Sequence, residues 1–142
     1  MKTITVISRY LLGLIFAIFG LNGFLHFIPM PPPSGVAGQY LGALFVSHYL
    51  APVFALQLIG GALLLANRYV PVALTLLGPV IVNVLLFHVL MAPEGLPQAI
   101  VVAVLWGVVF ASVRSAFAGI FLQRVAIDAA KSPRPAVSLK AA

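Results

Sequence analysis

Residues 70 to 91 read VPVALTLLGPVIVNVLLFHVLM, and this stretch decides the class of the protein. It contains no Asp, Glu, Lys or Arg, and its length matches the roughly 20 apolar residues that a helix needs to cross a bilayer. It lacks the period-two alternation of a half-buried strand, and it is longer than strands usually are. The stretch therefore predicts a membrane-spanning helix.

Three further apolar runs predict three more spans, at about residues 6–28, 50–66 and 97–114. Together with the span at 70–91 they would form one membrane domain over residues 1–120. We thus expect an all-α fold, an integral membrane four-helix bundle. Between the first two spans, prolines precede an apolar stretch from Val36 to Val46 that is too short to cross, which predicts a short interfacial helix.

Composition excludes several classes of protein. Of the 142 residues, 63% are hydrophobic and only 7% are charged, whereas a soluble domain carries roughly a quarter charged residues. The mean hydropathy of +1.17 agrees with a surface covered by lipid. The absence of cysteine excludes disulfides, thiolate metal sites and the membrane thiol oxidoreductases.

The net charge of +6 indicates orientation and does not suggest nucleic-acid binding, because the basic residues flank the apolar runs. All eight lie before the first span or just inside it, between the second and third spans, or after the fourth: Lys2, Arg9, Arg68, Arg114, Arg124, Lys131, Arg134 and Lys140. Short loops rich in Lys and Arg stay cytoplasmic. We therefore expect both termini inside, in a multi-pass protein of a bacterial or archaeal inner (cytoplasmic) membrane.

The sequence also predicts the structure of the two ends of the chain. The first run is too long for the apolar region of a signal peptide and has no cleavage site after it, so we expect it to remain as the first span. Residues 115–130 are expected to form an amphipathic helix on the inner surface. Residues 131–142, rich in proline and small residues, are expected to be a disordered tail.

Polar residues inside spans are costly and usually face a bundle interior or a cavity. Given the expected orientation, the amide and histidine side chains lie in the outer halves of their helices, and the inner halves keep only Ser and Thr. We predict that these five residues bind a ligand: Asn22, His26, Gln57, Asn83 and His88. Pro79 permits a kink before Asn83, and Gly60-Gly61 allows close approach of a neighbour or ligand. Residues of second rank are His48, Tyr49, Glu94, Gln98 and Trp106.

Simpler interpretations remain open for these residues. The three amides could hold helices together by hydrogen bonds, the histidines could be wetted from outside, Trp106 could serve packing, and Glu94 could sit in a solvated loop. No metal site is predicted, apart from the alternative in which His26 and His88 ligate a haem.

A resemblance follows from several short motifs: Arg9-Tyr10-x-x-Gly13-x-x-Phe16, Gly20-Leu21-Asn22-Gly23-Phe24-x-His26-Phe27, Gln57-x-x-Gly60-Gly61, Arg68-Tyr69-Val70-Pro71 and Gly78-Pro79-x-x-x-Asn83-x-x-x-x-His88. Their combination, over about residues 5–120, resembles the DoxX-like family of small four-helix membrane proteins. The resemblance implies no soluble catalytic domain; some members are subunits of membrane oxidoreductases, including a thiosulfate:quinone oxidoreductase. Many relatives carry Glu where Gln57 stands, which weakens a proton-relay role here.

The leading functional hypothesis is a membrane subunit of a larger redox or electron-transport assembly, lining a pocket for a quinone or another apolar ligand near the outer face. No cofactor is certain, although a quinone or a lipid would suit the residues. The chain is not expected to be an enzyme on its own. Expected partners are the bilayer and other membrane subunits or further copies of the chain, and no nucleic acid. The alternatives are a purely structural helix-bundle subunit and a small-solute transporter.

Overall fold

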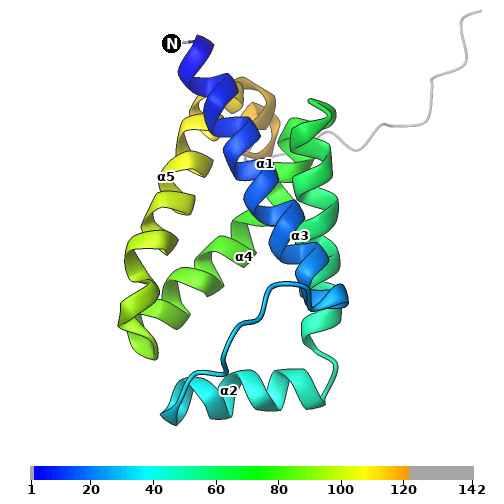
Figure 1. Ribbon diagram of the computed structural model, residues 1–142. Helices are drawn as coiled ribbons and strands as arrows, with labels where there is room; N and C mark the ends of the chain where they lie inside the picture. Colours follow the sequence, from blue (N-terminus) through cyan, green and yellow to red (C-terminus); the bar gives the residue numbers. More distant parts are fainter. Residues whose placement is uncertain (1, 122–142) are drawn as a thin grey trace, which may run out of the picture.

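The computed structural model describes residues 2–121, and within them the fold is all-helical, as the sequence predicts (Figure 1). The predicted tail, residues 131–142, and most of the predicted surface helix at 115–130 lie outside the described residues. The elements in chain order are α1 (Lys2–Leu25), α2 (Gly35–Val46), α3 (Leu50–Leu65), α4 (Val70–Leu90), the 3-10 helix η1 (Pro93–Gly95), α5 (Leu96–Val113) and the 3-10 helix η2 (Arg114–Phe121).

Three helical segments are long and apolar enough to cross a membrane by themselves: α1, α4 and the continuous run 93–120 that includes α5. Helix α3 has only 16 residues. It passes the same test only together with α2, from which it is bent by 88°. The structure is therefore compatible with three spans, or with four if the bent pair counts as one.

Helices α1, α3, α4 and α5 form the bundle. Helices α1 and α4 each pack against both α3 and α5. The interior is aliphatic, and its largest fully buried side chains are Leu12, Leu64, Leu74, Leu77 and Val109. Large apolar side chains also cover the outside, where Ile18, Val72 and Val104 are each more than two-fifths exposed. Such a continuous apolar exterior suits contact with lipid chains.

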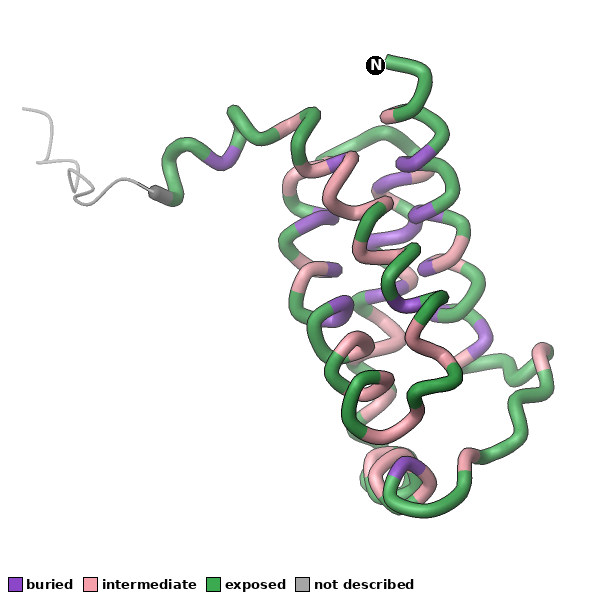
Figure 2. The backbone as a smooth tube through the Cα atoms, turned by 90° about the vertical axis from the view of Figure 1, so that its left-hand side faces the viewer, coloured by how far each residue is buried: buried purple, intermediate pink, exposed green. Residues whose placement is uncertain are grey.

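Helix α2 is separate from this bundle and lies across one end of it (Figure 1). Buried positions recur along the bundle helices, whereas α2 buries only Ala37 and is otherwise exposed or half-buried (Figure 2). The chain enters α2 at Gly35, whose φ of +64° is accessible to glycine without strain. It leaves through His48, which also has a positive φ. The predicted short helix between the first two spans is thus present.

The closest helix pair is α1 with α3, whose backbones touch through small residues. A Cβ added to Gly61 would lie 2.5 Å from the backbone nitrogen of Ala17, and one added to Gly20 would lie 2.6 Å from that of Leu58. On the other side of α3, Gly60 faces the Leu77 side chain of α4. Gly60-Gly61 therefore allows close approach of neighbouring helices on two sides, which confirms the prediction for neighbours.

Arg9 has a structural role that its use as an orientation signal does not reveal. It is 7% exposed, and its Nη1 donates to the carbonyl of Leu64 and, at 3.5 Å, to that of Leu65. These carbonyls end α3, where the last turn leaves acceptors unsatisfied and the helix dipole is negative. The guanidinium carbon also lies 4.3 Å from the centroid of the Tyr10 ring. Arg9 thus fixes the start of α1 to the end of α3.

Helix α4 continues through Pro79, which cannot donate a hydrogen bond to the carbonyl four residues earlier. In this region Trp106 of α5 donates from Nε1 to the Leu74 carbonyl at 3.0 Å. Its ring stacks on Phe110, with centroids 4.9 Å apart. Trp106 thus packs within the bundle and connects α5 to the proline-containing half of α4.

Candidate ligand-binding groove

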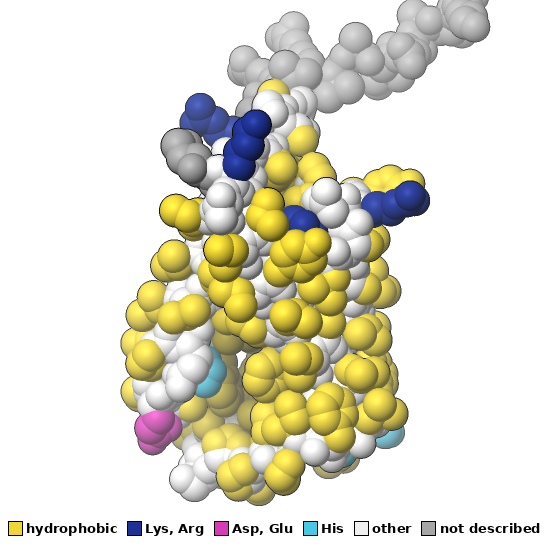
Figure 3. Space-filling view, turned by 45° about the horizontal axis from the view of Figure 1, so that its top comes forward, with side chains coloured by type: hydrophobic (Ala, Val, Ile, Leu, Met, Phe, Trp, Pro, Cys, Tyr) yellow, Lys and Arg dark blue, Asp and Glu magenta, His cyan; other side chains and the backbone are white. Residues whose placement is uncertain are grey.

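The two ends of the molecule differ in charge. Basic side chains gather at one end, which we call the basic end, and the acidic and histidine side chains lie toward the other (Figure 3). The opposite end is the α2 end, because α2 lies across it (Figure 1). His26 follows the end of α1, His48 precedes α3, and His88 lies in the last turn of α4. The structure therefore places all three histidines toward the α2 end.

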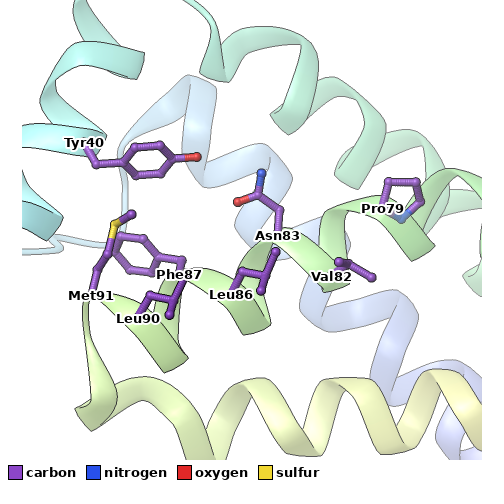
Figure 4. Close-up of a pocket in the computed structure, with 8 residues that line it drawn as sticks. All are labelled: Tyr40, Pro79, Val82, Asn83, Leu86, Phe87, Leu90 and Met91. Atoms are coloured by element: carbon purple, nitrogen blue, oxygen red, sulfur yellow. The ribbon is translucent and has the colours of Figure 1, made fainter.

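A groove lies between α2 and α4 at this end, with a volume of about 600 Å³ (Figure 4). This volume is within the range of small-molecule sites. We call it the α2–α4 groove. Its lining residues are Tyr40, Pro79, Val82, Asn83, Leu86, Phe87, Leu90 and Met91.

Two polar groups meet across these apolar walls. The Tyr40 hydroxyl of α2 points toward the Asn83 carboxamide of α4 (Figure 4). The Tyr40 ring contacts Phe87, with centroids 6.1 Å apart and planes at 30°. A hydroxyl and an amide can both donate to and accept from a ligand oxygen. The groove thus offers an apolar cleft with two convergent polar groups.

The α4 part of the groove faces away from the bundle core. Leu77 and Ile81 are buried in the core, whereas Val82 and Asn83 are exposed. At 100° per residue these two pairs occupy opposite sides of the helix. The groove therefore opens at the side of the bundle, and only α2 covers it.

The side chain of Asn22 hydrogen-bonds to the turn that follows its own helix, α1. It is 2% exposed, its Oδ1 accepts from the Ile28 backbone nitrogen at 2.6 Å, and its Nδ2 donates to the Ile28 carbonyl at 3.3 Å. These bonds fold the chain back after α1. His26 lies in this turn with φ of 52°, exposed to its surroundings, and its ring is 6.1 Å from that of Phe45 in α2.

His88 and Gln57 do not line the groove either. His88 donates from Nδ1 to the Ala92 carbonyl at 2.9 Å, and its ring lies where a Cβ on Gly95 would be. It therefore shapes the turn from α4 into α5. Gln57 is 9% exposed within the bundle, one helical turn before Gly60.

The second-rank residues near this end are surface residues. His48, Tyr49, Glu94 and Gln98 are all exposed, and none lines the groove. Of the five predicted ligand-binding residues, the structure brings only Asn83 into it. Sequence reasoning missed Tyr40, Phe87 and Met91. Tyr40 had one usable signal, a hydroxyl in the middle of the short apolar stretch 36–46.

Residues 2–121 contain no group of three or more His, Asp or Glu side chains that could hold a metal ion. Comparison with known proteins adds no relative: no family model, no curated protein and no solved structure matches this chain.

Proposed function

We propose that this protein is a DoxX-like, multi-pass membrane subunit that binds a lipid-soluble ligand with a carbonyl headgroup, such as a quinone, in the α2–α4 groove. The observation that carries the proposal is the pairing of Tyr40 and Asn83 across otherwise apolar walls (Figure 4). Their hydroxyl and amide would donate hydrogen bonds to the headgroup oxygens. Leu86, Leu90 and Phe87 would hold the apolar part.

The position of the groove supports a ligand that arrives through the bilayer. Its α4 wall lies on the exposed, apolar side of the bundle, where lipid chains would pass. A water-soluble ligand would have to cross that apolar surface, whereas a quinone already partitions into it. The role as a non-catalytic subunit of a redox assembly rests on the DoxX-like resemblance, because this chain has no cysteine and would need a partner to supply the redox chemistry.

The proposed topology has four spans with both termini in the cytoplasm of a bacterial or archaeal cell. Support comes from the gathering of basic side chains at one end (Figure 3) and from the tendency of such ends to stay inside. Reporter fusions to the C-terminus test it. Fluorescence of a cytoplasmic green fluorescent protein fusion is expected, and activity of an exported alkaline phosphatase fusion would refute the orientation.

Quenching of the single tryptophan tests ligand binding. Trp106 lies against Gly78, next to the groove residue Pro79, so a bound quinone would quench its fluorescence. Decyl-benzoquinone is titrated into the purified protein in mild detergent, for the wild type and for Asn83→Leu and Tyr40→Phe. Each substitution removes one hydrogen-bonding group, so we expect affinity about three- to tenfold weaker.

The matched control is Gln39→Leu, which removes an exposed amide from α2 outside the groove. Its affinity should equal that of the wild type. Equal affinity of all four proteins would refute the groove as the site. The structural alternative, in which the polar residues only hold the chain together, would then be the better account.

A further inference from the structure

The basic end carries three exposed cations on three different elements. Lys2 begins α1, Arg68 lies in the turn between α3 and α4, and Arg114 begins η2. We call these residues the basic rim, because they are spread around that end of the molecule (Figure 3). Glu94 is the only acidic residue among residues 2–121, and it belongs to η1 near the other end. The rim therefore has no acidic counter-charge within the described part of the chain.

We propose that the basic rim binds the phosphate headgroups of anionic phospholipids in the leaflet at that end. The inference rests on the proposed membrane location and is independent of the ligand in the groove. Arginine guanidinium groups bind phosphate oxygens by charge-assisted hydrogen bonds. Cations beside a membrane are attracted to anionic lipids at close range.

The spacing of the cations favours a lipid surface over a single free anion. A site for one phosphate would need several cations that converge on one point, whereas the Lys and Arg side chains stand at separate places around the basic end (Figure 3). Large side chains close to the cations in sequence or in the same helices are also exposed, since Ile4, Tyr69 and Ile120 are each more than three-fifths exposed. Cations alternating with exposed apolar and tyrosine side chains match the boundary between headgroups and lipid chains.

The local backbone presents Arg68 outward. Its neighbours Asn67 and Tyr69 both have left-handed conformations, with φ of 53° and 51°, which makes a tight turn with Arg68 at an exposed position. Arg9 is not part of the basic rim, but it contributes to the positive charge at this end. It is buried and bonded to the carbonyls that end α3, so it offsets the negative helix end that would otherwise repel phosphate.

Lipid retention tests the proposal on the full chain. The protein is reconstituted into nanodiscs of phosphatidylcholine and phosphatidylglycerol in equal amounts, extracted in mild detergent, and the lipids that remain bound are counted by native mass spectrometry. The wild type should retain phosphatidylglycerol preferentially. The double variant Arg68→Gln/Arg114→Gln should lose this preference, by about fivefold for each charge removed at low ionic strength.

The matched control is Lys131→Gln/Lys140→Gln, which removes the same net charge from residues outside the rim and should retain the preference. Arg68→Lys/Arg114→Lys keeps the charge and should also retain most of it. Equal loss in the rim and control variants would mean that net charge alone matters, and no preference in the wild type would overturn the proposal. Millimolar inorganic phosphate should not displace the lipid; displacement would point to a free-anion site instead.

The same samples separate this proposal from the groove ligand. Quenching of Trp106 by decyl-benzoquinone reports on the groove, which the rim substitutions do not touch. Lipid preference without quinone binding would refute the groove proposal alone. Quinone binding without lipid preference would refute the rim proposal alone.

Discussion

The α1–α3 contact and the α2–α4 groove show two opposite ways of placing helices beside each other. In the first, Gly20 and Gly61 let two backbones touch, and Arg9 fastens one end. In the second, a groove of about 600 Å³ lies between the helices, and the ring contact between Tyr40 and Phe87 connects its two walls. The closest packing occurs at glycines, which have no side chain, and the candidate site lies where packing between helices is incomplete. This division is common, because binding regions are drawn from the less stable parts of a fold.

The largest expected effect is at the glycine contact. In Gly61→Ala the new Cβ would meet the backbone of α1, at 2.5 Å from the Ala17 nitrogen and 2.8 Å from the Gly13 oxygen. Backbone atoms cannot rotate away, so the helices must separate. We expect a loss of about 2–3 kcal/mol in the free energy of unfolding, measured by the loss of helical circular dichroism during titration with sodium dodecyl sulfate.

A glycine-to-alanine substitution in α2, the helix outside the bundle, is the control. A Cβ on Gly42 of α2 would meet no atom within 4 Å. Gly42→Ala should therefore be neutral or stabilising by about 0.5 kcal/mol, since alanine favours helix more than glycine. Equal losses at the two positions would remove the distinction between the two regions.

A smaller effect is expected at Arg9. Arg9→Met keeps an apolar side chain but leaves the carbonyls of Leu64 and Leu65 without their donor. Hydrogen bonds from a charged group contribute about 2 kcal/mol, so we expect a loss of this size in the same titration. Arg68→Met removes an exposed arginine and should change stability by less than about 0.5 kcal/mol. Similar results for both variants would contradict the capping role.

The smallest effect is expected at Trp106, which bonds to α4, the helix that forms one wall of the groove. Trp106→Phe keeps a ring to stack on Phe110 but loses the hydrogen bond to the Leu74 carbonyl. We expect a loss of about 1 kcal/mol in the detergent titration followed by circular dichroism. Phe19→Leu, at an exposed apolar position of α1, should leave stability nearly unchanged. A Trp106→Phe protein as stable as the wild type would show that the bond does not help to hold α4.

Much of the fold follows from hydropathy alone. The run at residues 70–91 coincides with α4, and the stretch from Val36 to Val46 coincides with α2. The run at residues 50–66 likewise matches α3, but the 88° angle between α2 and α3 could not be predicted. Apolar composition does not report the direction of a chain, and here that direction changes at His48, a residue without the usual glycine signal for a positive φ.

The site was harder to predict, because hydropathy reports depth along a helix more readily than the direction of a side chain. Asn83 and His88 lie in the same helix but point to different sides, so one lines the groove and the other bonds to Ala92. Asn22 near the end of α1 bonds to the following turn, as short polar side chains near helix ends often do. Tyr40 reaches the groove only because α2 folds back beneath the bundle, which is a tertiary feature.

The 16-residue length of α3 has a consequence for the membrane itself. At 1.5 Å per residue the helix is about 24 Å long, whereas the hydrocarbon layer of a typical bilayer is about 30 Å thick. In the proposed four-span topology, lipids that border α3 would therefore have to compress by several ångströms, or tilt around its ends. The protein would then prefer thinner bilayers, and the cost of this hydrophobic mismatch would favour covering α3 with another transmembrane helix.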